Sequence, residues 1–304
     1  MVATSQPKFG VPDAPGTSTL VDVQLDALGR PMPDLSDIPA LDPDREHNAT
    51  IISMTNQKGG VGKTTTAINL GAALVELGYR VLLVDFDPQG SLSVGLGVNP
   101  HNLEQSIYNL LLTRNAQVDD ILHETSVPGL DILPSNIDLS AAEVQLVSEV
   151  AREQTLQRVL QPLRNKYDLI LIDCAPSLGL LTVNALTTSD FVIVPLECEY
   201  FALRGVALLT ETIEKVAERL NPRLEILGIL ATMFDSRTLH AQEVLQRVVQ
   251  AFGDQVFHTV IRRTIKFPET TVAGEPITTY AAASPGADAY RQLAKEVLLR
   301  CQNR

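Results

Sequence analysis

From about residue 49 to residue 304, the sequence predicts one α/β domain with a mostly parallel, twisted sheet that carries helices on both faces. Short runs of Val, Ile and Leu alternate with longer segments of helical periodicity, and no linker interrupts the alternation. Strands that read as continuous apolar runs are typical of a parallel sheet covered on both sides. The third observation is a loop rich in glycine and lysine, placed between the first strand and the first helix.

Each predicted element is bounded by polar or turn-forming residues. The expected strands lie within residues 50–56, 80–87, 129–135, 167–177, 190–197 and 224–234. The expected helices cover about 64–78, 139–164, 179–187, 202–219, 238–251 and 286–301. This order of strand and helix is that of a single domain without internal repeats.

Residues 1–48 differ from the rest of the chain. They contain seven prolines and eight acidic residues, against only three basic ones, Lys8, Arg30 and Arg45. The segment shows no sustained periodicity, so it cannot bury enough apolar surface to offset the entropy of ordering it. We therefore expect a disordered, acidic, proline-rich arm.

Composition favours a cytoplasmic protein. The three cysteines are widely spaced and form no metal-ligand pattern, which is typical of reduced thiols. No apolar run approaches the roughly 20 residues of a membrane-spanning helix, and the first residues do not resemble an export signal. The net charge of −12 argues against a uniformly positive surface but leaves room for a local basic face.

Residues 56–67, with the sequence NQKGGVGKTTTA, have the composition of a phosphate-binding loop. The strict pattern requires glycine where Gln57 stands, and it has no use for the extra lysine, Lys58. The glycines allow backbone N–H groups to converge on phosphate oxygens at the start of a helix. Lys63 is placed to reach the β- and γ-phosphates, and the Thr64 hydroxyl is placed to ligate Mg²⁺. The predicted nucleotide-binding residues are Gly59, Gly60, Val61, Gly62, Lys63, Thr64 and Thr65.

Two strand ends carry acidic residues that a magnesium nucleotide site requires. Asp173 follows four apolar residues in LILID, which is the form of the strand that completes such a site. Asp85 and Asp87 alternate at the end of another strand and therefore point to opposite sides. Asp87 is a candidate for orienting the attacking water. Asp85 fits either the nucleotide site or a buried structural role, and the sequence does not decide between them.

Three segments, KGGVGKTTT, VLLVDFDPQGSLSVGLGV and YDLILIDCAPSLGLLTVNAL, together resemble the ParA (Soj-like) partition ATPases. These proteins belong to the deviant Walker A group, which also includes the MinD division-site ATPases. The resemblance covers about residues 50–300. It implies a P-loop NTPase domain, slow intrinsic hydrolysis of ATP and a dependence on Mg²⁺.

The same resemblance assigns roles to individual residues. Lys58 would reach across a homodimer interface to the ATP of the partner, which would couple nucleotide binding to association. Asp87 would serve hydrolysis, and Thr64, Asp87 and Asp173 would surround the Mg²⁺. The expected catalytic set is therefore Lys58, Lys63 and Asp87.

The surface that binds the target, DNA or membrane, distinguishes ParA-like proteins from MinD-like proteins. ParA-like dimers bind double-stranded DNA without sequence preference at the nucleoid, and a ParB-like centromere-binding partner stimulates their hydrolysis. Five basic residues lie between 237 and 266, against only two acidic ones, which favours phosphate-backbone contacts. We expect Arg237, Arg263 and Lys266 to contact DNA, although a scattered solvated face would give the same composition. The family often has Pro-Arg-Asn where residues 262–264 stand.

Two other functions remain open for a protein of this group. A MinD-like protein would bind membrane through an amphipathic C-terminal helix, whereas the spacing in residues 286–301 favours a helix packed on the sheet, and thus no membrane attachment. A ParA-like ATPase could instead position a protein cargo.

Overall fold

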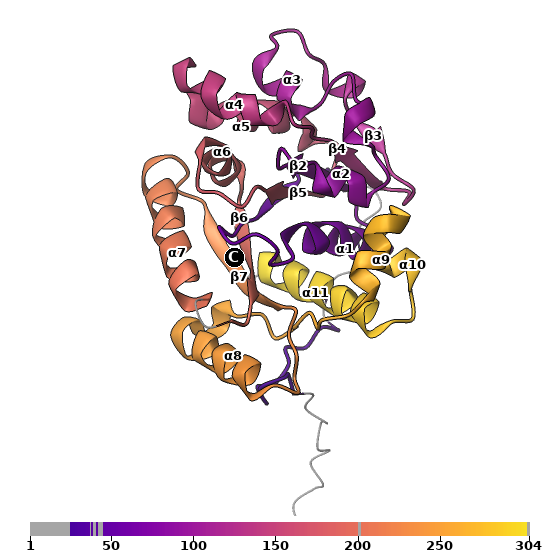
Figure 1. Cartoon of the computed structure of the whole chain (residues 1–304), viewed down its shortest axis with the longest axis vertical. Helices are drawn as coiled ribbons and strands as arrows, with labels where there is room; N and C mark the ends of the chain where they lie inside the picture. Colours follow the sequence, from indigo (N-terminus) through magenta and orange to yellow (C-terminus); the bar gives the residue numbers. More distant parts are fainter. Residues whose placement is uncertain (1–24, 37, 39–40, 42–44, 200–201, 303–304) are drawn as a thin grey trace, which may run out of the picture.

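In the computed structural model of this protein, the described residues are 25–36, 38, 41, 45–199 and 202–302. Their strands form one seven-stranded sheet in the order β3-β4-β2-β5-β1-β6-β7 (Figure 1). The paired strands run parallel except for the short pair β3 and β4, which is antiparallel. The strands are β1 (Thr50–Met54), β2 (Val81–Phe86), β3 (His123–Glu124), β4 (Leu130–Leu133), β5 (Leu169–Cys174), β6 (Phe191–Glu197) and β7 (Glu225–Thr232).

Helices cover both faces of this sheet, as the sequence predicts. They are α1 (Lys63–Glu76), α2 (Ser91–Gly95), α3 (Ile107–Leu112), α4 (Leu139–Gln145), α5 (Thr155–Leu160), α6 (Leu180–Thr188), α7 (Ala202–Arg219), α8 (Leu239–Phe252), α9 (Lys266–Ala273), α10 (Ile277–Tyr280) and α11 (Pro285–Gln302). One face packs on α1 and α11. The other packs on α3 to α6 over the centre of the sheet, and on α7 and α8 over β6 and β7 (Figure 1).

The alternation of side chains along each strand divides the core between these faces. In β1, Ile52 and Met54 join the cluster around α1 and α11, whereas Ile51 joins the cluster on the opposite face. All three are almost completely buried. Each fully buried side chain of this size contributes about 1.5–3 kcal/mol. Both faces of the strand are therefore apolar, which accounts for the unbroken apolar runs in the sequence.

The six predicted strands are confirmed, but one predicted helix is wrong. Residues 139–164 do not form one helix, because the chain leaves helical geometry between α4 and α5. Glu149 is extended (φ −81°, ψ 143°) and Ala151 has a left-handed backbone (φ 54°). Five further elements are not predicted from the sequence, and each is eight residues or shorter: β3, α2, α3, α9 and α10. Elements this short give too little periodicity to be recognised.

Part of the N-terminal segment contacts the domain. Arg30 pairs with Asp26 and donates hydrogen bonds to the carbonyls of Val256 and Phe257 at 3.3 and 2.9 Å. Arg45 pairs with Asp168 at 2.5 Å. The described residues of the expected arm thus make defined contacts. The expected disorder of residues 1–24 lies outside the described residues.

The C-terminal helix packs on the sheet, which confirms the prediction. Tyr290, Leu293 and Val297 of α11 are buried in the cluster that contains α1. Among the described residues, no helix has the length and apolar character needed to cross a membrane.

Candidate nucleotide-binding site

The loop between β1 and α1 adopts a backbone that requires glycine. Gly60 and Gly62 have left-handed φ values of 74° and 83°, and Gly62 directly precedes the first residue of α1. Such a backbone is strained for residues with a Cβ. The Thr232 hydroxyl donates a 2.8 Å hydrogen bond to the carbonyl of Val61, which ties the loop to the end of β7. The loop is thus shaped and anchored where α1 begins.

A second anchor holds the first half of the loop. The side-chain amide of Asn56 donates to the carbonyl of Pro195 in β6 at 2.7 Å. Its oxygen accepts the N–H of Lys58 at 3.0 Å. The loop is therefore attached to two neighbouring strands, β6 and β7, before any nucleotide binds.

Lys63 lies inside the loop. Its side chain is buried, and its ammonium group lies 3.5 Å from the carbonyl of Lys58, at the limit of a hydrogen bond. A lysine held this weakly keeps hydrogen-bonding capacity for phosphate oxygens. The role of Lys63 in binding phosphates stays a prediction.

Thr64 and Asp173 are in direct contact. The Thr64 hydroxyl donates to Asp173 Oδ2 at 2.6 Å, while Asp173 Oδ1 is buried without a hydrogen-bond partner among the described residues. Burial, together with the charge of Asp85, raises the pKa of Asp173 to about 8. Asp85 stands opposite Asp173 in the register of β2 and β5. An orphaned carboxylate oxygen beside a hydroxyl fits a divalent cation, which would offset the cost of burying this charge.

Asp85 has a structural role, which resolves the alternative left open by the sequence. Its Oδ2 accepts hydrogen bonds from the backbone and the hydroxyl of Ser93, at 2.8 and 2.7 Å. Burial still raises the pKa of Asp85 to about 7. Asp85 therefore attaches α2 to the end of β2.

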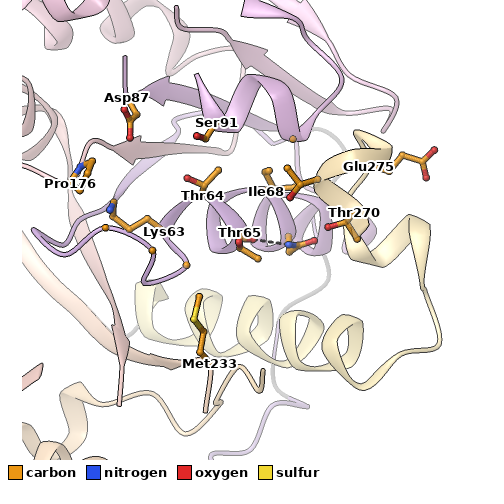
Figure 2. Close-up of a pocket in the computed structure, with 16 residues that line it drawn as sticks. Lys63, Thr64, Thr65, Ile68, Asp87, Ser91, Pro176, Met233, Thr270 and Glu275 are labelled. Atoms are coloured by element: carbon orange, nitrogen blue, oxygen red, sulfur yellow. Dashed lines mark hydrogen bonds between the residues drawn. The ribbon is translucent and has the colours of Figure 1, made fainter. Parts of the chain in front are cut away.

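Asp87 lines the cavity. One of its oxygens accepts the N–H of Gln89 at 2.9 Å, which stabilises the turn after β2. Figure 2 shows the carboxylate of Asp87 directed into the cavity, at the end where Lys63 and Pro176 lie. Its part in holding Mg²⁺ or orienting water stays a prediction.

The cavity beside the loop has a volume of about 370 Å³, within the range of small-molecule sites. Figure 2 shows that it extends from Lys63 and Asp87 towards Ile68 and Thr270. Its lining comprises Gly59, Gly60, Gly62, Lys63, Thr64, Thr65, Ile68, Asn69, Asp87, Ser91, Gly95, Pro176, Met233, Thr270, Thr271 and Glu275.

The far wall of this cavity was missed from the sequence. Thr270 and Glu275 belong to α9 and the turn after it, about 200 residues away from the loop. Asn69 brings the two regions together, because its amide donates to the carbonyl of Thr65 and its oxygen accepts the N–H of Ile277 at 2.7 Å. In the sequence, the only signal for this contact was an asparagine in the middle of a largely apolar helix.

Lys58 lies apart from the lining of this cavity. Its ammonium group pairs with Glu197 at 2.9 Å and with Glu199 at 2.5 Å, at the end of β6. Half of its side chain is exposed. The two lysines of the loop therefore have different surroundings.

The predicted DNA-contacting residues lie on the surface, and each has an acidic partner. Arg237 pairs with Asp235 at 2.8 Å, Arg263 with Glu197 at 2.9 Å, and Lys266 with Glu269 at 2.8 Å. The side chains of Arg237 and Arg263 are 87% and 66% exposed. Surface pairs of this kind contribute little stability.

Folding brings part of the basic stretch together. The segment that contains Phe234 pairs with the segment that contains Arg262, and Arg263 N–H donates to the Phe234 carbonyl at 3.3 Å. Arg237 follows Phe234 closely, so it lies near Arg262 and Arg263. Arg262 is exposed and forms no ion pair within the described part of the chain. The sequence analysis did not select it as a contact residue.

This fold and loop define a P-loop nucleotide-binding protein, and comparison with known proteins gives its family. A family model described as an AAA domain matches residues 49–226. A protein of Mycobacterium tuberculosis is 57% identical over 296 residues, which cover 97% of this chain and 91% of the relative. The sporulation initiation inhibitor protein Soj of Bacillus subtilis is 49% identical and covers 81% of this chain and 97% of its own length. The chain therefore belongs to the ParA (Soj-like) family of P-loop ATPases.

Solved structures show the same fold. A Mycobacterium smegmatis structure described as cobyrinic acid a,c-diamide synthase, with a bound ATP analogue and magnesium, has a TM-score of 0.74 and 42% identity, covering 84% of this chain and 96% of that one. The septum site-determining protein MinD of Pyrococcus horikoshii, complexed with Mg-ADP, has a TM-score of 0.66 and 30% identity, covering 82% and 96%. Bound adenine nucleotide and magnesium in these relatives agree with the cofactors predicted for this chain.

Proposed function

We propose that this protein is an ATPase of DNA segregation, in which an ATP-bound homodimer binds double-stranded DNA without sequence preference. The observation that carries this proposal is the separation of the two loop lysines. Lys63 lies in the cavity, whereas Lys58 pairs with carboxylates outside it. Lys63 would bind the nucleotide of its own chain, and Lys58, once released from its carboxylates, would reach the nucleotide of a second chain.

The cavity would bind ATP and hydrolyse it with water to ADP and phosphate. Backbone N–H groups of the loop and the Lys63 ammonium would donate hydrogen bonds to the phosphates. Mg²⁺, when bound at Thr64 and Asp173, would neutralise charge on the phosphate oxygens. Asp87 would orient the attacking water, with its carboxylate as the hydrogen-bond acceptor.

Intrinsic turnover would be slow. Cys174 and Ala175 follow Asp173 at the end of β5, so neither Glu nor Gln stands there to position water. A ParB-type partner would accelerate hydrolysis and return the dimer to monomers. ATP would therefore act as a timer for association.

The surface that carries the predicted residues Arg237, Arg263 and Lys266, together with the exposed Arg262, would provide the DNA contacts. These are electrostatic contacts to phosphates, so they carry no sequence preference and weaken as salt rises. The protein would accordingly be found on the nucleoid, in the cytoplasm. Membrane attachment through the C-terminal helix is not supported, because the apolar face of α11 is buried against α1.

The experiment is a measurement of ATP hydrolysis, with matched binding assays. The full chain is incubated with Mg²⁺-ATP alone, with DNA, and with DNA plus a ParB-type protein. We expect slow hydrolysis that rises in the last mixture, and no co-sedimentation with anionic liposomes. Liposome binding without DNA binding would favour the MinD-like alternative. If neither DNA nor the partner changes the rate of hydrolysis, two other functions are favoured. One is a synthase, the activity for which the M. smegmatis relative is named, and the other is an ATPase that positions a protein cargo.

A further inference from the structure

Lys58 lies between two carboxylates of its own chain. Glu197 is the last residue of β6, which runs beside β1 in the sheet, and Glu199 lies two residues further along the chain. The Asn56 bridge to Pro195 holds the loop against this same strand. The contact between Lys58 and the two carboxylates is therefore built into the connection between the loop and the sheet.

These carboxylates neutralise Lys58 and hold its proton. The hydrogen bond to Glu199 is the largest influence and, with that to Glu197, it raises the pKa of Lys58 against the opposing effect of burial. Glu197 is also shared, because its second oxygen accepts a 2.9 Å hydrogen bond from Arg263. Glu199 accepts a hydrogen bond from Lys58, and the more distant charge of Arg263 adds only a smaller effect that also lowers the pKa of Glu199.

We propose that Glu197 and Glu199 hold Lys58 in cis in the monomer, and that the lysine must leave them when the ATP-bound dimer forms. The proposal rests on the function proposed above, in which Lys58 binds the phosphates of the partner chain. An interaction made only in the monomer opposes association by its own free energy. Glu197 and Glu199 are thus positioning residues that set the threshold for dimerisation.

We call the contact of Lys58 with Glu197 and Glu199 the latch, and it is weak enough to be broken reversibly. The side chains of Lys58 and Glu199 are 50% and 56% exposed, and exposed ion pairs shift an equilibrium by up to about fivefold. A triphosphate presents several charged acceptor oxygens, so it can replace the two carboxylates as hydrogen-bond partners of the ammonium group. The latch would therefore delay association without preventing it.

Glu199→Gln tests the latch most cleanly, because it removes a carboxylate that contacts Lys58 and leaves the Glu197–Arg263 pair intact. Sedimentation velocity of the full chain, with Mg²⁺ and a non-hydrolysable ATP analogue, gives the protein concentration for half dimerisation. We expect this concentration to fall about two- to fivefold. Asp119→Asn is the matched control, since it removes one carboxylate from another exposed lysine pair, with Lys166, and should leave the concentration unchanged.

A measurement on the nucleotide-free monomer tests the contact itself. Removing Glu199 lowers the pKa of Lys58, so more of the amine is neutral and it should react faster with acetic anhydride. Peptide mass spectrometry of Glu199→Gln and of Asp119→Asn measures this rate.

Equal acetylation and equal dimerisation of wild type and Glu199→Gln would overturn the latch. If Lys58→Ala also fails to dimerise in the same assay, the result supports the function proposed for this lysine and contradicts only the latch. If Lys58→Ala dimerises like wild type, both fall.

Discussion

The Thr64 hydroxyl donates a 2.6 Å hydrogen bond to Asp173, which joins the first turn of α1 to the end of β5. These residues are more than 100 positions apart in the sequence. The contact leaves the second oxygen of Asp173 buried and unpaired, and this is the feature of the site that most favours a bound cation.

Thr64→Ala should remove the dependence of ATP affinity on Mg²⁺. Without the hydroxyl, the cation loses one ligand and Asp173 loses its hydrogen bond, so affinity for Mg²⁺-ATP should fall about 10- to 100-fold. Isothermal titration calorimetry with and without Mg²⁺ measures this difference. Thr64→Ser keeps the hydroxyl and should bind almost as wild type. Retention of the full Mg²⁺ effect in Thr64→Ala would contradict the assignment.

Lys63→Ala should weaken ATP binding about 30- to 150-fold, because it removes charged hydrogen bonds worth about 2–3 kcal/mol. Lys58→Ala is the matched control, since it removes the same charge from the same loop. It should bind ATP normally as a monomer and fail to dimerise. Fluorescence titration with a labelled ATP analogue measures both variants. Equal losses in the two would mean that the lysines do not have separate roles.

Asp87→Ala should lower the rate of ATP hydrolysis by about 100-fold or more, because the attacking water loses its orienting acceptor. ATP binding should be retained, so the variant should accumulate as an ATP-bound dimer on DNA. Phosphate release under single-turnover conditions gives the rate. Asp119→Ala, at an exposed acidic residue, serves as control. Hydrolysis by Asp87→Ala at the wild-type rate would refute this role.

Asp168→Asn should lower the free energy of unfolding by about 2–3 kcal/mol. Burial raises the pKa of Asp168, but hydrogen bonds from Arg45, the Arg80 backbone and His47 outweigh burial and hold the pKa below its ordinary value of 3.8. The stabilisation is therefore present above about pH 4 and is lost as the pH falls through the folded-state value.

Urea unfolding at pH 7 and at pH 3 measures the stability of this variant. The difference from wild type should shrink at the lower pH. Glu218→Gln, at an exposed carboxylate of α7, is the comparison. A difference that stays constant with pH would show that the charge of Asp168 does not carry the effect.

Much of the fold follows from local sequence, because buried parallel strands need apolar residues on both faces. The phosphate loop was equally predictable, since glycines, Lys63 and Thr64 act within one turn of each other. The far wall of the cavity was not, because Thr270 reaches the loop only through the packing of α9 and α10. The pairing of Lys58 with Glu197 and Glu199 depends on the neighbourhood of β1 and β6, which local patterns do not specify.

The basic residues between 237 and 266 also have contacts that the sequence pattern did not predict. Their composition predicted a positive surface, but Arg237, Arg263 and Lys266 each lie beside an acidic residue that folding brings into contact. Two of these partners, Asp235 and Glu269, are close in sequence, and Glu197 is distant. A count of charges along the chain does not reveal such pairing.

The central claim is that ATP converts this chain into a DNA-binding dimer, and an electrophoretic mobility shift with a non-specific duplex tests it most directly. The wild-type chain should shift the duplex with Mg²⁺-ATP and leave it unshifted with ADP or without nucleotide. The shift should weaken as salt rises and disappear in Lys58→Ala, which still binds ATP. A shift that is the same with ATP, with ADP and in Lys58→Ala would contradict the claim, as would no shift under any of these conditions.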